Sequence, residues 1–277
     1  MDVFAAFIAP ALAGVFVGVM SGLLGVGGGT IMVPIFRLAF GMSPLASTAT
    51  SLFAIIPTSI SGVVAHARAK TCVPKLGLAL GVGGAVMSPM GVWLASVSPG
   101  WLVICVAAIV IGFSAFKMFK KAVKCAPSPR VGRAGGNAQA ASAKAVPDQP
   151  VLSRKQYLQG ACIGLIAGLA SGYVGVGGGF IMVPLMLAVL DIPMSLASGT
   201  SLIAITILAI PGVIEQGLLG NIEYLAGIAI VVGSIPGALV GARLVRVVPE
   251  RQLRFIFGGF LLVAAVMLML NEFGILG

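Results

Sequence analysis

Two identical glycine runs are the residues of this chain whose type and spacing suggest chemistry. Residues 25–29 read Gly-Val-Gly-Gly-Gly, and residues 175–179 repeat the same letters 150 positions later. Consecutive glycines oppose a regular helix, each by about 1 kcal/mol relative to alanine, because they have no side chain to pack. Where such a run opens a helix, unpaired backbone N–H groups and the positive end of the helix dipole favour an anion. We therefore predict an anion site made of backbone amides.

The predicted substrate-binding residues lie in and after these runs. They are the last glycines of each run and the residue that follows, Gly27, Gly28, Gly29 and Thr30 in the first copy and Gly177, Gly178, Gly179 and Phe180 in the second. The next helix of each copy adds a hydroxyl pair, Thr50-Ser51 and Thr200-Ser201. Those hydroxyls either donate to the oxygens of an anion or bond back to carbonyls of their own helix, and the sequence leaves both readings open.

Two further polar residues stand in or beside apolar segments. Arg37 corresponds to Leu187 in the second copy, so it is not part of the repeated pattern. A charge there is costly unless it faces a cavity or reaches the interface, so Arg37 is either an interfacial anchor or an anion-attracting residue of an outer vestibule. His66 is the only histidine and precedes Arg68. We interpret it as an interfacial loop residue rather than a gate or a proton acceptor.

The elements that must position these residues are membrane-spanning helices. Hydrophobic residues make up 59% of the chain, charged residues only 9%, and the mean hydropathy is +1.13. A soluble domain would carry about a quarter charged residues. Apolar stretches of about 17–23 residues recur, close to the ~20 that a helix needs to cross the bilayer core. The ten-residue alternation of a β-barrel is absent. The sequence therefore predicts an all-α polytopic membrane protein.

Charge and cysteine usage exclude several other classes. The net charge of +10 sits in short loops and one linker, as membrane topology requires, so we expect the lipid bilayer and not nucleic acid as partner. The four cysteines form no CxxC pair, and we expect no metal, disulfide or cofactor. No clustered carboxylates, paired histidines or nucleophile with its base stand out, so the chain is not expected to be an enzyme.

The repeat defines the organisation of the chain. The offset of 150 continues without a gap, for example from Gly14 to Gly164 and from Pro99 to Pro249. We assign residues 1–119 to a first transmembrane repeat, 120–154 to a basic flexible linker and 155–277 to a second repeat. The linker holds almost nothing large and apolar, so it cannot bury itself. The glycines spaced by four residues, as at positions 14, 18 and 22, are interpreted as helix-packing residues.

The basic loops predict how each copy lies in the membrane. In the first copy the basic loop is the one with Arg68, Lys70 and Lys75. In the second copy the equivalent loop, 214–223, has no Lys or Arg, and the next loop carries the arginines instead, Arg243, Arg246, Arg251 and Arg254. With basic loops and the linker in the cytoplasm, the second copy is inverted and both termini lie outside. The glycine elements are either re-entrant or full spans, and we favour half-helices meeting inside the protein.

The doubled motif is recognisable. Two copies of Ser-Gly-x-x-Gly-Val-Gly-Gly-Gly-x-Ile-Met-Val-Pro, each followed by a Thr-Ser helix, resemble the sulfite exporter TauE/SafE family. The resemblance covers both repeats and leaves out only the linker. It implies a multi-pass carrier in the bacterial inner membrane for a small sulfur-containing anion, such as sulfite, thiosulfate, sulfoacetate or another organosulfonate.

We therefore expect a secondary transporter that works by alternating access, with the substrate held by glycine-loop amides and Thr/Ser hydroxyls. An anion channel or facilitator for oxyanions would use the same amides as a selectivity ring. A non-transporting membrane scaffold is the third reading, although it would have no need of broken helices. The anion, the direction of transport and any coupling ion stay open. The glycine-rich helix faces serve either internal packing or a homodimer contact.

Overall fold

The computed structural model describes most of both repeats. The residues described are 8–38, 40–99, 101–120 except 103, 104, 107, 110, 111, 114, 117 and 118, then 153–174, 177–245 and 247–272. The predicted linker and both chain termini therefore lie almost wholly outside the described residues, and so do Gly175 and Val176 of the second glycine run. The division of the chain into two repeats and a linker stays a prediction.

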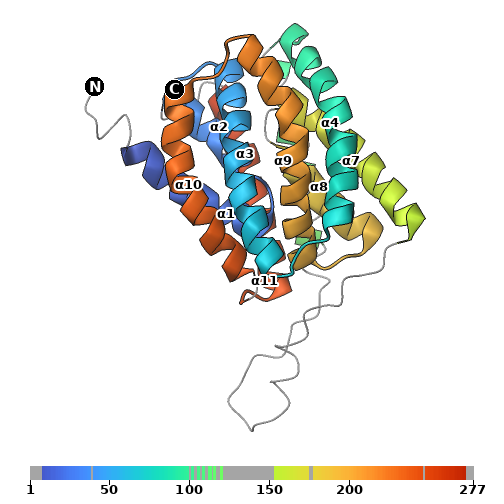
Figure 1. The fold of residues 1–277 in the computed structure, drawn as a ribbon. Coiled ribbons are helices and arrows are strands. Elements are labelled where there is room, and N and C mark those ends of the chain that lie inside the picture. The colour runs from blue at the N-terminus through green and yellow to red at the C-terminus, as the bar shows by residue number, and fades with distance from the viewer. Residues whose placement is uncertain are drawn as a thin grey trace.

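The described elements are all helices, which confirms the all-α prediction (Figure 1). The first half contains α1 (Ala9–Leu24), α2 (Gly29–Leu38), α3 (Pro44–Arg68) and α4 (Pro74–Val97), and the described part of residues 101–120 is helical as well. The second half contains α7 (Arg154–Val174), α8 (Gly179–Leu185), the π-helical turn η2 (Met186–Leu190), α9 (Met194–Leu218), α10 (Tyr224–Leu244) and α11 (Glu250–Glu272). Five of them, α3, α4, α7, α9 and α10, are long and apolar enough to cross a membrane. The chain is thus a multi-pass membrane protein.

Local chemistry explains where the helices begin and end. Proline, whose missing N–H costs nothing in a first turn, opens α3 and α4. The hydroxyl of Ser43 accepts a 3.2 Å hydrogen bond from the Ala46 N–H and so caps α3. Helix α1 stops at Gly25, whose φ of +71° turns the chain left-handed while its N–H returns to the Ser21 carbonyl. The first glycine run therefore separates α1 from α2.

Spaced glycines bring the two halves together. A Cβ on Gly14, Gly18 or Gly22 of α1 would overlap a carbonyl oxygen of α10, and a Cβ on Gly164, Gly168 or Gly172 of α7 would overlap one of α4. The second set of contacts repeats the first with an offset of 150 residues. Helix backbones approach this closely only where no side chain intervenes. These glycines therefore serve internal packing, one of the two roles that the sequence left open.

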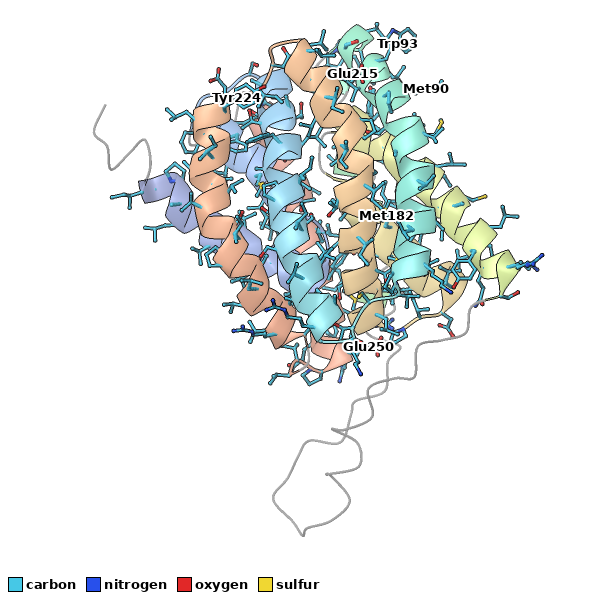
Figure 2. All side chains as sticks on the ribbon, viewed as in Figure 1. Met90, Trp93, Met182, Glu215, Tyr224 and Glu250 are labelled. Atoms are coloured by element: carbon cyan, nitrogen blue, oxygen red, sulfur yellow. The ribbon has the colours of Figure 1, made fainter. Side chains whose placement is uncertain are left out.

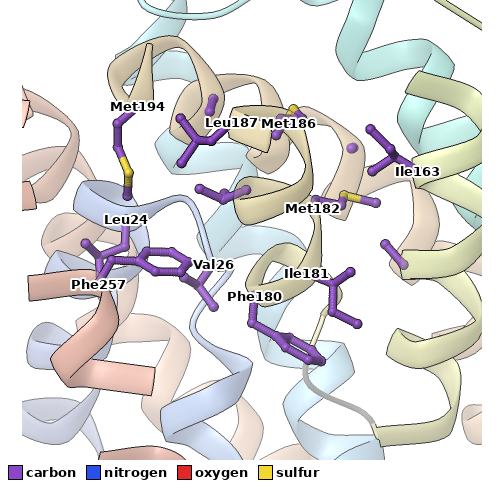
Figure 3. Close-up of a cluster of buried hydrophobic side chains, with 14 of the residues drawn as sticks. Leu24, Val26, Ile163, Phe180, Ile181, Met182, Met186, Leu187, Met194 and Phe257 are labelled. Atoms are coloured by element: carbon purple, nitrogen blue, oxygen red, sulfur yellow. The ribbon is translucent and has the colours of Figure 1, made fainter. Parts of the chain in front are cut away.

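The longest helices of the two halves cross between these pairs. Gly62 of α3 lies against Leu202 of α9, and Gly212 of α9 lies 3.5 Å, measured from an added Cβ, from Leu52 of α3. Because the later residue of each helix meets the earlier residue of the other, α3 and α9 run antiparallel along their contact. Buried hydrophobic side chains from α1, α7, α8, η2, α9 and α11 form one cluster (Figure 3).

Charged residues lie at both ends of the helix bundle. Figure 2 shows Glu250 at one end and Glu215 with Tyr224 at the other. The loop after α3 lies at the Glu250 end, because the Val73 N–H donates to Thr200 near the start of α9, whose Met194 N–H donates to Glu250. We call this the basic end, since its loops and helix ends carry Arg68, Lys70, Lys75, Arg251 and Arg254. The side of the membrane that the basic end faces stays a prediction.

Candidate functional site

The two glycine runs touch each other inside the protein. A Cβ on Gly179 would lie 2.7 Å from the carbonyl oxygen of Gly25 and 2.8 Å from the Cα atom of Val26. We call residues 25–29 and 175–179 the first and second glycine loops. The first loop and the described part of the second are buried. The short helices α2 and α8 begin at these loops, so their starts meet from the two halves of the chain.

Backbone conformation explains why the loops are made of glycine. Gly25, Gly27 and Gly28 have φ angles of +71°, +81° and +84°, and Gly177 and Gly178 have φ angles of +86° and +69°. These values lie in the left-handed region that side chains with a Cβ rarely adopt. The loops end where helical bonding starts, as the Met32 N–H donates to the Gly28 carbonyl and the Met182 N–H to the Gly178 carbonyl. Among the N–H groups before those points, those of Ile31, Gly179 and Ile181 donate to the carbonyls of Gly28, Gly177 and Gly178. The other amides of a first helical turn have no acceptor within their own helix.

Two isoleucines enclose the loops at the crossing of α3 and α9. A Cβ on Gly27 would lie 2.9 Å from Ile205 and 3.3 Å from Ile55, and one on Gly177 would lie 2.9 Å from Ile55 and 3.6 Å from Ile205. Both isoleucines are fully buried. Each loop is therefore held between the same two side chains, one from each half of the chain.

Three buried hydroxyls beside the loops, those of Ser21, Thr30 and Ser171, lack a hydrogen-bond partner among the described residues, and so does the hydroxyl of Ser51 in α3. All four residues are fully buried. Leaving a hydroxyl buried without a partner costs about 1–3 kcal/mol, so such groups are uncommon unless a ligand or water binds them. They supply donors for a ligand with oxygen acceptors.

Ser21 and Ser171 were not among the predicted site residues. The Cβ of Ser21 lies 3.6 Å from the Cβ position of Gly28, and the Cβ of Ser171 lies 3.3 Å from that of Gly178. Each sits in the last part of the helix that leads into its loop. The sequence could have identified them, because each serine is the first residue of the doubled motif.

The predicted Thr-Ser pairs take different roles. The hydroxyl of Ser201 donates to the carbonyl oxygens of Gly25 at 2.6 Å and of Ser198 at 2.8 Å. Ser201 therefore anchors the first glycine loop to α9. Ser51, at the equivalent place in α3, is one of the unpartnered hydroxyls. The structure thus brings Ser201 to the first glycine loop and leaves the Ser51 donor in α3 unused.

The two threonines hold the starts of other helices. Thr200 accepts a 3.0 Å hydrogen bond from the Val73 N–H and donates to the Leu196 carbonyl of its own helix. Thr50 accepts a 3.0 Å hydrogen bond from the Glu223 N–H. Val73 and Glu223 are the N-cap residues of α4 and α10, so each threonine links one half of the chain to the other. Their contact with substrate stays a prediction.

The remaining predicted residues lie apart from the loop amides. Phe180 is fully buried and points its ring into the hydrophobic cluster, so only its backbone can serve an anion (Figure 3). Arg37 lies in the last turn of α2, eight residues after Gly29, which is roughly 12 Å along a helix. The structure therefore does not bring Arg37 to the loops.

His66 is not the interfacial loop residue that we expected. It is fully buried in α3, because that helix continues to Arg68 and turns the ring inward. Its Nε2 donates to the Gly22 carbonyl at 2.9 Å, since a carbonyl can only accept, and its Nδ1 lies 2.7 Å from the Thr71 hydroxyl. His66 therefore ties the end of α1 to the loop between α3 and α4.

In the loop between α3 and α4, burial raises the pKa of the Cys72 thiol, which stays neutral at pH 7.

One cavity beside α8 has an apolar character. It has a volume of about 560 Å³ and lies between α4, α7, α8 and the described part of residues 101–120. Its lining is almost entirely apolar and includes Leu94, Phe113, Ile166 and Pro184. Such a wall offers an anion no hydrogen-bond donors.

No group of three or more His, Cys, Asp or Glu able to hold a metal occurs in the part of the chain that the structure describes.

Comparisons with known proteins match nearly the whole chain. The family model described as Sulfite exporter TauE/SafE matches residues 10–268. The chain is 28% identical over 238 residues to the Probable membrane transporter protein YdhB of Bacillus subtilis, covering 86% of this chain and 89% of that protein. It is 26% identical over 255 residues to the Probable membrane transporter protein YunE of the same organism, covering 87% and 89%. It is 34% identical over 111 residues to the Sulfite exporter TauE/SafE family protein 3 of Arabidopsis thaliana, covering 38% and 23%. No solved structure matches significantly.

Proposed function

The chain belongs to the sulfite exporter TauE/SafE family and is a membrane transporter of that type, and from this premise we propose that it carries a small sulfur-containing anion across the bacterial inner membrane. The substrate is a sulfite, thiosulfate, sulfoacetate or other organosulfonate. It binds where the first and second glycine loops meet. We propose that the substrate anion occupies this site and that no cofactor binds there.

The contact between the two loops carries the proposal. Gly179 lies against Gly25 and Val26, so the starts of α2 and α8, one from each half of the chain, lie close enough to serve one ligand. The unpartnered hydroxyls of Ser21 and Ser171 belong to residues beside the loops, and those of Thr30 and Ser51 lie in α2 and α3. A sulfite or sulfonate group has three oxygen acceptors and no need of a counter-cation where N–H dipoles converge. The helix-start amides and the unpartnered hydroxyls match that chemistry.

Transport by alternating access fits the repeated contacts between the halves. The pairs α1 with α10 and α7 with α4 pack through the same glycine positions, and α3 and α9 cross antiparallel. In the proposed mechanism the two halves are inverted repeats that rock about this crossing. Ile55 and Ile205 close over the loops between the two openings. A channel with a permanently open selectivity ring would leave the loops uncovered, so the carrier is favoured.

Flux measurements on purified protein in liposomes test the proposal. Uptake of sulfite, thiosulfate, sulfoacetate, taurine, sulfate and chloride is compared for the natural chain and for the double variant Ser21→Ala with Ser171→Ala. We expect saturable flux selective for sulfur anions, and a KM raised several-fold in the variant. Removing unpartnered hydroxyls leaves no orphaned group, so the variant should fold. Ser96→Ala, which alters an exposed serine of α4 bonded to Trp93, is the matched control.

Three outcomes would contradict the proposal. Equal, non-saturating flux of chloride and sulfate would indicate a channel. Absence of flux from folded protein would indicate a scaffold. Unchanged KM in the double serine variant, together with unchanged flux in Gly28→Val with Gly178→Val, would move the substrate away from the glycine loops.

A further inference from the structure

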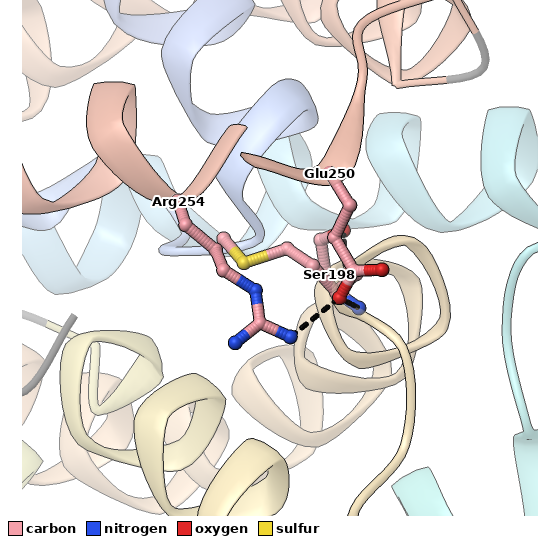
Figure 4. A network of polar contacts seen from close by, with 4 residues as sticks. Ser198, Glu250 and Arg254 are labelled. Atoms are coloured by element: carbon pink, nitrogen blue, oxygen red, sulfur yellow. Dashed lines mark hydrogen bonds and ion pairs between the residues drawn. The ribbon is translucent and has the colours of Figure 1, made fainter. Parts of the chain in front are cut away.

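Arg254 is a buried cation with unused hydrogen-bond donors. Only 8% of its side chain is exposed, and its Nη2 donates to Glu250 Oε1 at 2.6 Å (Figure 4). Its Nε and Nη1 have no hydrogen-bond partner within the described ranges. A guanidinium offers five N–H donors, and leaving them buried and unmatched is costly. The site therefore has more donor capacity than the chain itself uses.

Glu250 occupies a position suited to an anion. The same Oε1 atom accepts a 3.2 Å hydrogen bond from the N–H of Met194, the first residue of α9. That helix has 25 residues, and its start favours negative charge. A carboxylate thus lies between a guanidinium and a helix-start amide. The side chain of Glu250 is 43% exposed, so it reaches water and can turn away without being buried elsewhere.

The pair stands one helical turn from the first glycine loop. Ser198 donates to the Met194 carbonyl at 2.8 Å, and its backbone packs directly against Gly25. Figure 4 shows Arg254, Glu250 and Ser198 drawn together around the start of α9. A ligand on Arg254 would therefore be close to the amides of the loop, on the side of the basic end.

The pair has no counterpart at the matching positions of the first half of the sequence. At an offset of 150 residues, Glu250 and Arg254 correspond to Gly100 and Ile104, neither of which carries a charge. From the sequence we predicted that Arg254 lies in a basic loop with the other arginines. That assignment is wrong for Arg254, which lies inside α11. Its position in the first turns of α11 turns it toward α9 and excludes it from water. An anion that bound Arg254 would therefore meet no equivalent charged pair at the matching positions of the first half.

We propose that Arg254 is an anion-binding subsite at the basic end, where the substrate replaces the Glu250 carboxylate before it reaches the glycine loops. The ligand class is a small oxyanion or sulfonate with at least two free oxygens, which suits the fork of a guanidinium. The inference rests on the proposed function, since the substrate is taken to be an anion. Glu250 acts as a tethered competitor, and its carboxylate moves into water when the anion binds.

Opposite effects of two substitutions test the subsite. Sulfite and thiosulfate binding to the purified full chain is measured by calorimetry, with flux in liposomes and thermal unfolding alongside. Arg254→Gln should weaken sulfite binding about tenfold or more, because charge-assisted hydrogen bonds are lost. Glu250→Gln should tighten it, because a larger fraction of the protein then has Arg254 available. Arg251→Gln is the matched control, since Arg251 lies on the same helix over the Phe255 ring.

The results separate this inference from the proposed function. Weaker binding in both variants, with matching losses of thermal stability, would show that the pair is only structural and would overturn the subsite. Unchanged affinity in both would do the same while natural flux persists. Absence of anion binding and of flux in the natural chain would instead overturn the proposed function. Should Arg254→Gln not fold, Arg254→Lys, which loses the planar fork but keeps the charge, and Glu250→Gln carry the test.

Discussion

The hydroxyl of Ser201 donates a 2.6 Å hydrogen bond to the carbonyl oxygen of Gly25, so a helix of the second half holds the glycine loop of the first. Both residues are buried, and the loop conformation depends on a left-handed glycine that no other residue replaces easily. The proposed binding site therefore depends on both halves of the chain together.

Removing the Ser201 hydroxyl should destabilise the protein. Ser201→Ala leaves the Gly25 carbonyl without this donor in a buried place, and we expect a loss of about 1–2 kcal/mol. The midpoint of thermal unfolding in detergent should fall accordingly. Ser51→Ala is the matched comparison, because the Ser51 hydroxyl has no partner among the described residues. Equal falls in the two variants would show that the Gly25 bond does not stabilise the loop.

Close helix contacts through glycine should tolerate no methyl group. Gly18→Ala would place a Cβ against the backbone of Ser234, and Gly168→Ala would place one against the backbone of Gly84. Backbone cannot move aside cheaply, so each variant should lose more than about 2 kcal/mol or fail to yield monodisperse protein. Gly259→Ala in α11, with open space within 4 Å among the described atoms, should be neutral or slightly stabilising. A destabilised Gly259→Ala would contradict this reading.

The ring of His66 should matter for its hydrogen bonds. His66→Ala removes both the donor to the Gly22 carbonyl and the contact with Thr71, and we expect a loss of about 1–3 kcal/mol of stability. His66→Gln should retain more, because the second half has Gln216 at this position, bonded to Asn221 at 2.8 Å. Thermal unfolding of the two variants compares them directly. A Gln variant as unstable as the Ala variant would argue against the hydrogen bonds as the cause.

The two ends of the bundle should face opposite sides of the membrane. In a background without native cysteines, Arg68→Cys marks the basic end and Glu223→Cys the other, and both positions are exposed. The positive-inside rule places Arg68 in the cytoplasm. In intact bacteria an impermeant maleimide should therefore label Glu223→Cys and spare Arg68→Cys until the cells are opened. Labelling of both before lysis would refute the predicted inversion.

Much of the fold could be read from local sequence. The helical class follows from long apolar segments, and the helix ends follow from prolines and glycines such as Gly25. The contact between the glycine loops was expected from their matched positions. The hydrogen-bond partners of the hydroxyls could not be predicted from the sequence. Thr50 and Thr200 cap helices of the opposite half, while Ser21 and Ser171 face the loops.

The sequence by itself determined the helical membrane class, the repeat and the places where helices break, because hydropathy and backbone freedom are properties of short segments. Only the tertiary structure decided which polar groups are left for a ligand. Burial and hydrogen bonding depend on which distant helix packs against a residue. His66 and Arg254 look like surface residues in the sequence, and packing of α3 against α1 and of α11 against α9 withdraws both from water.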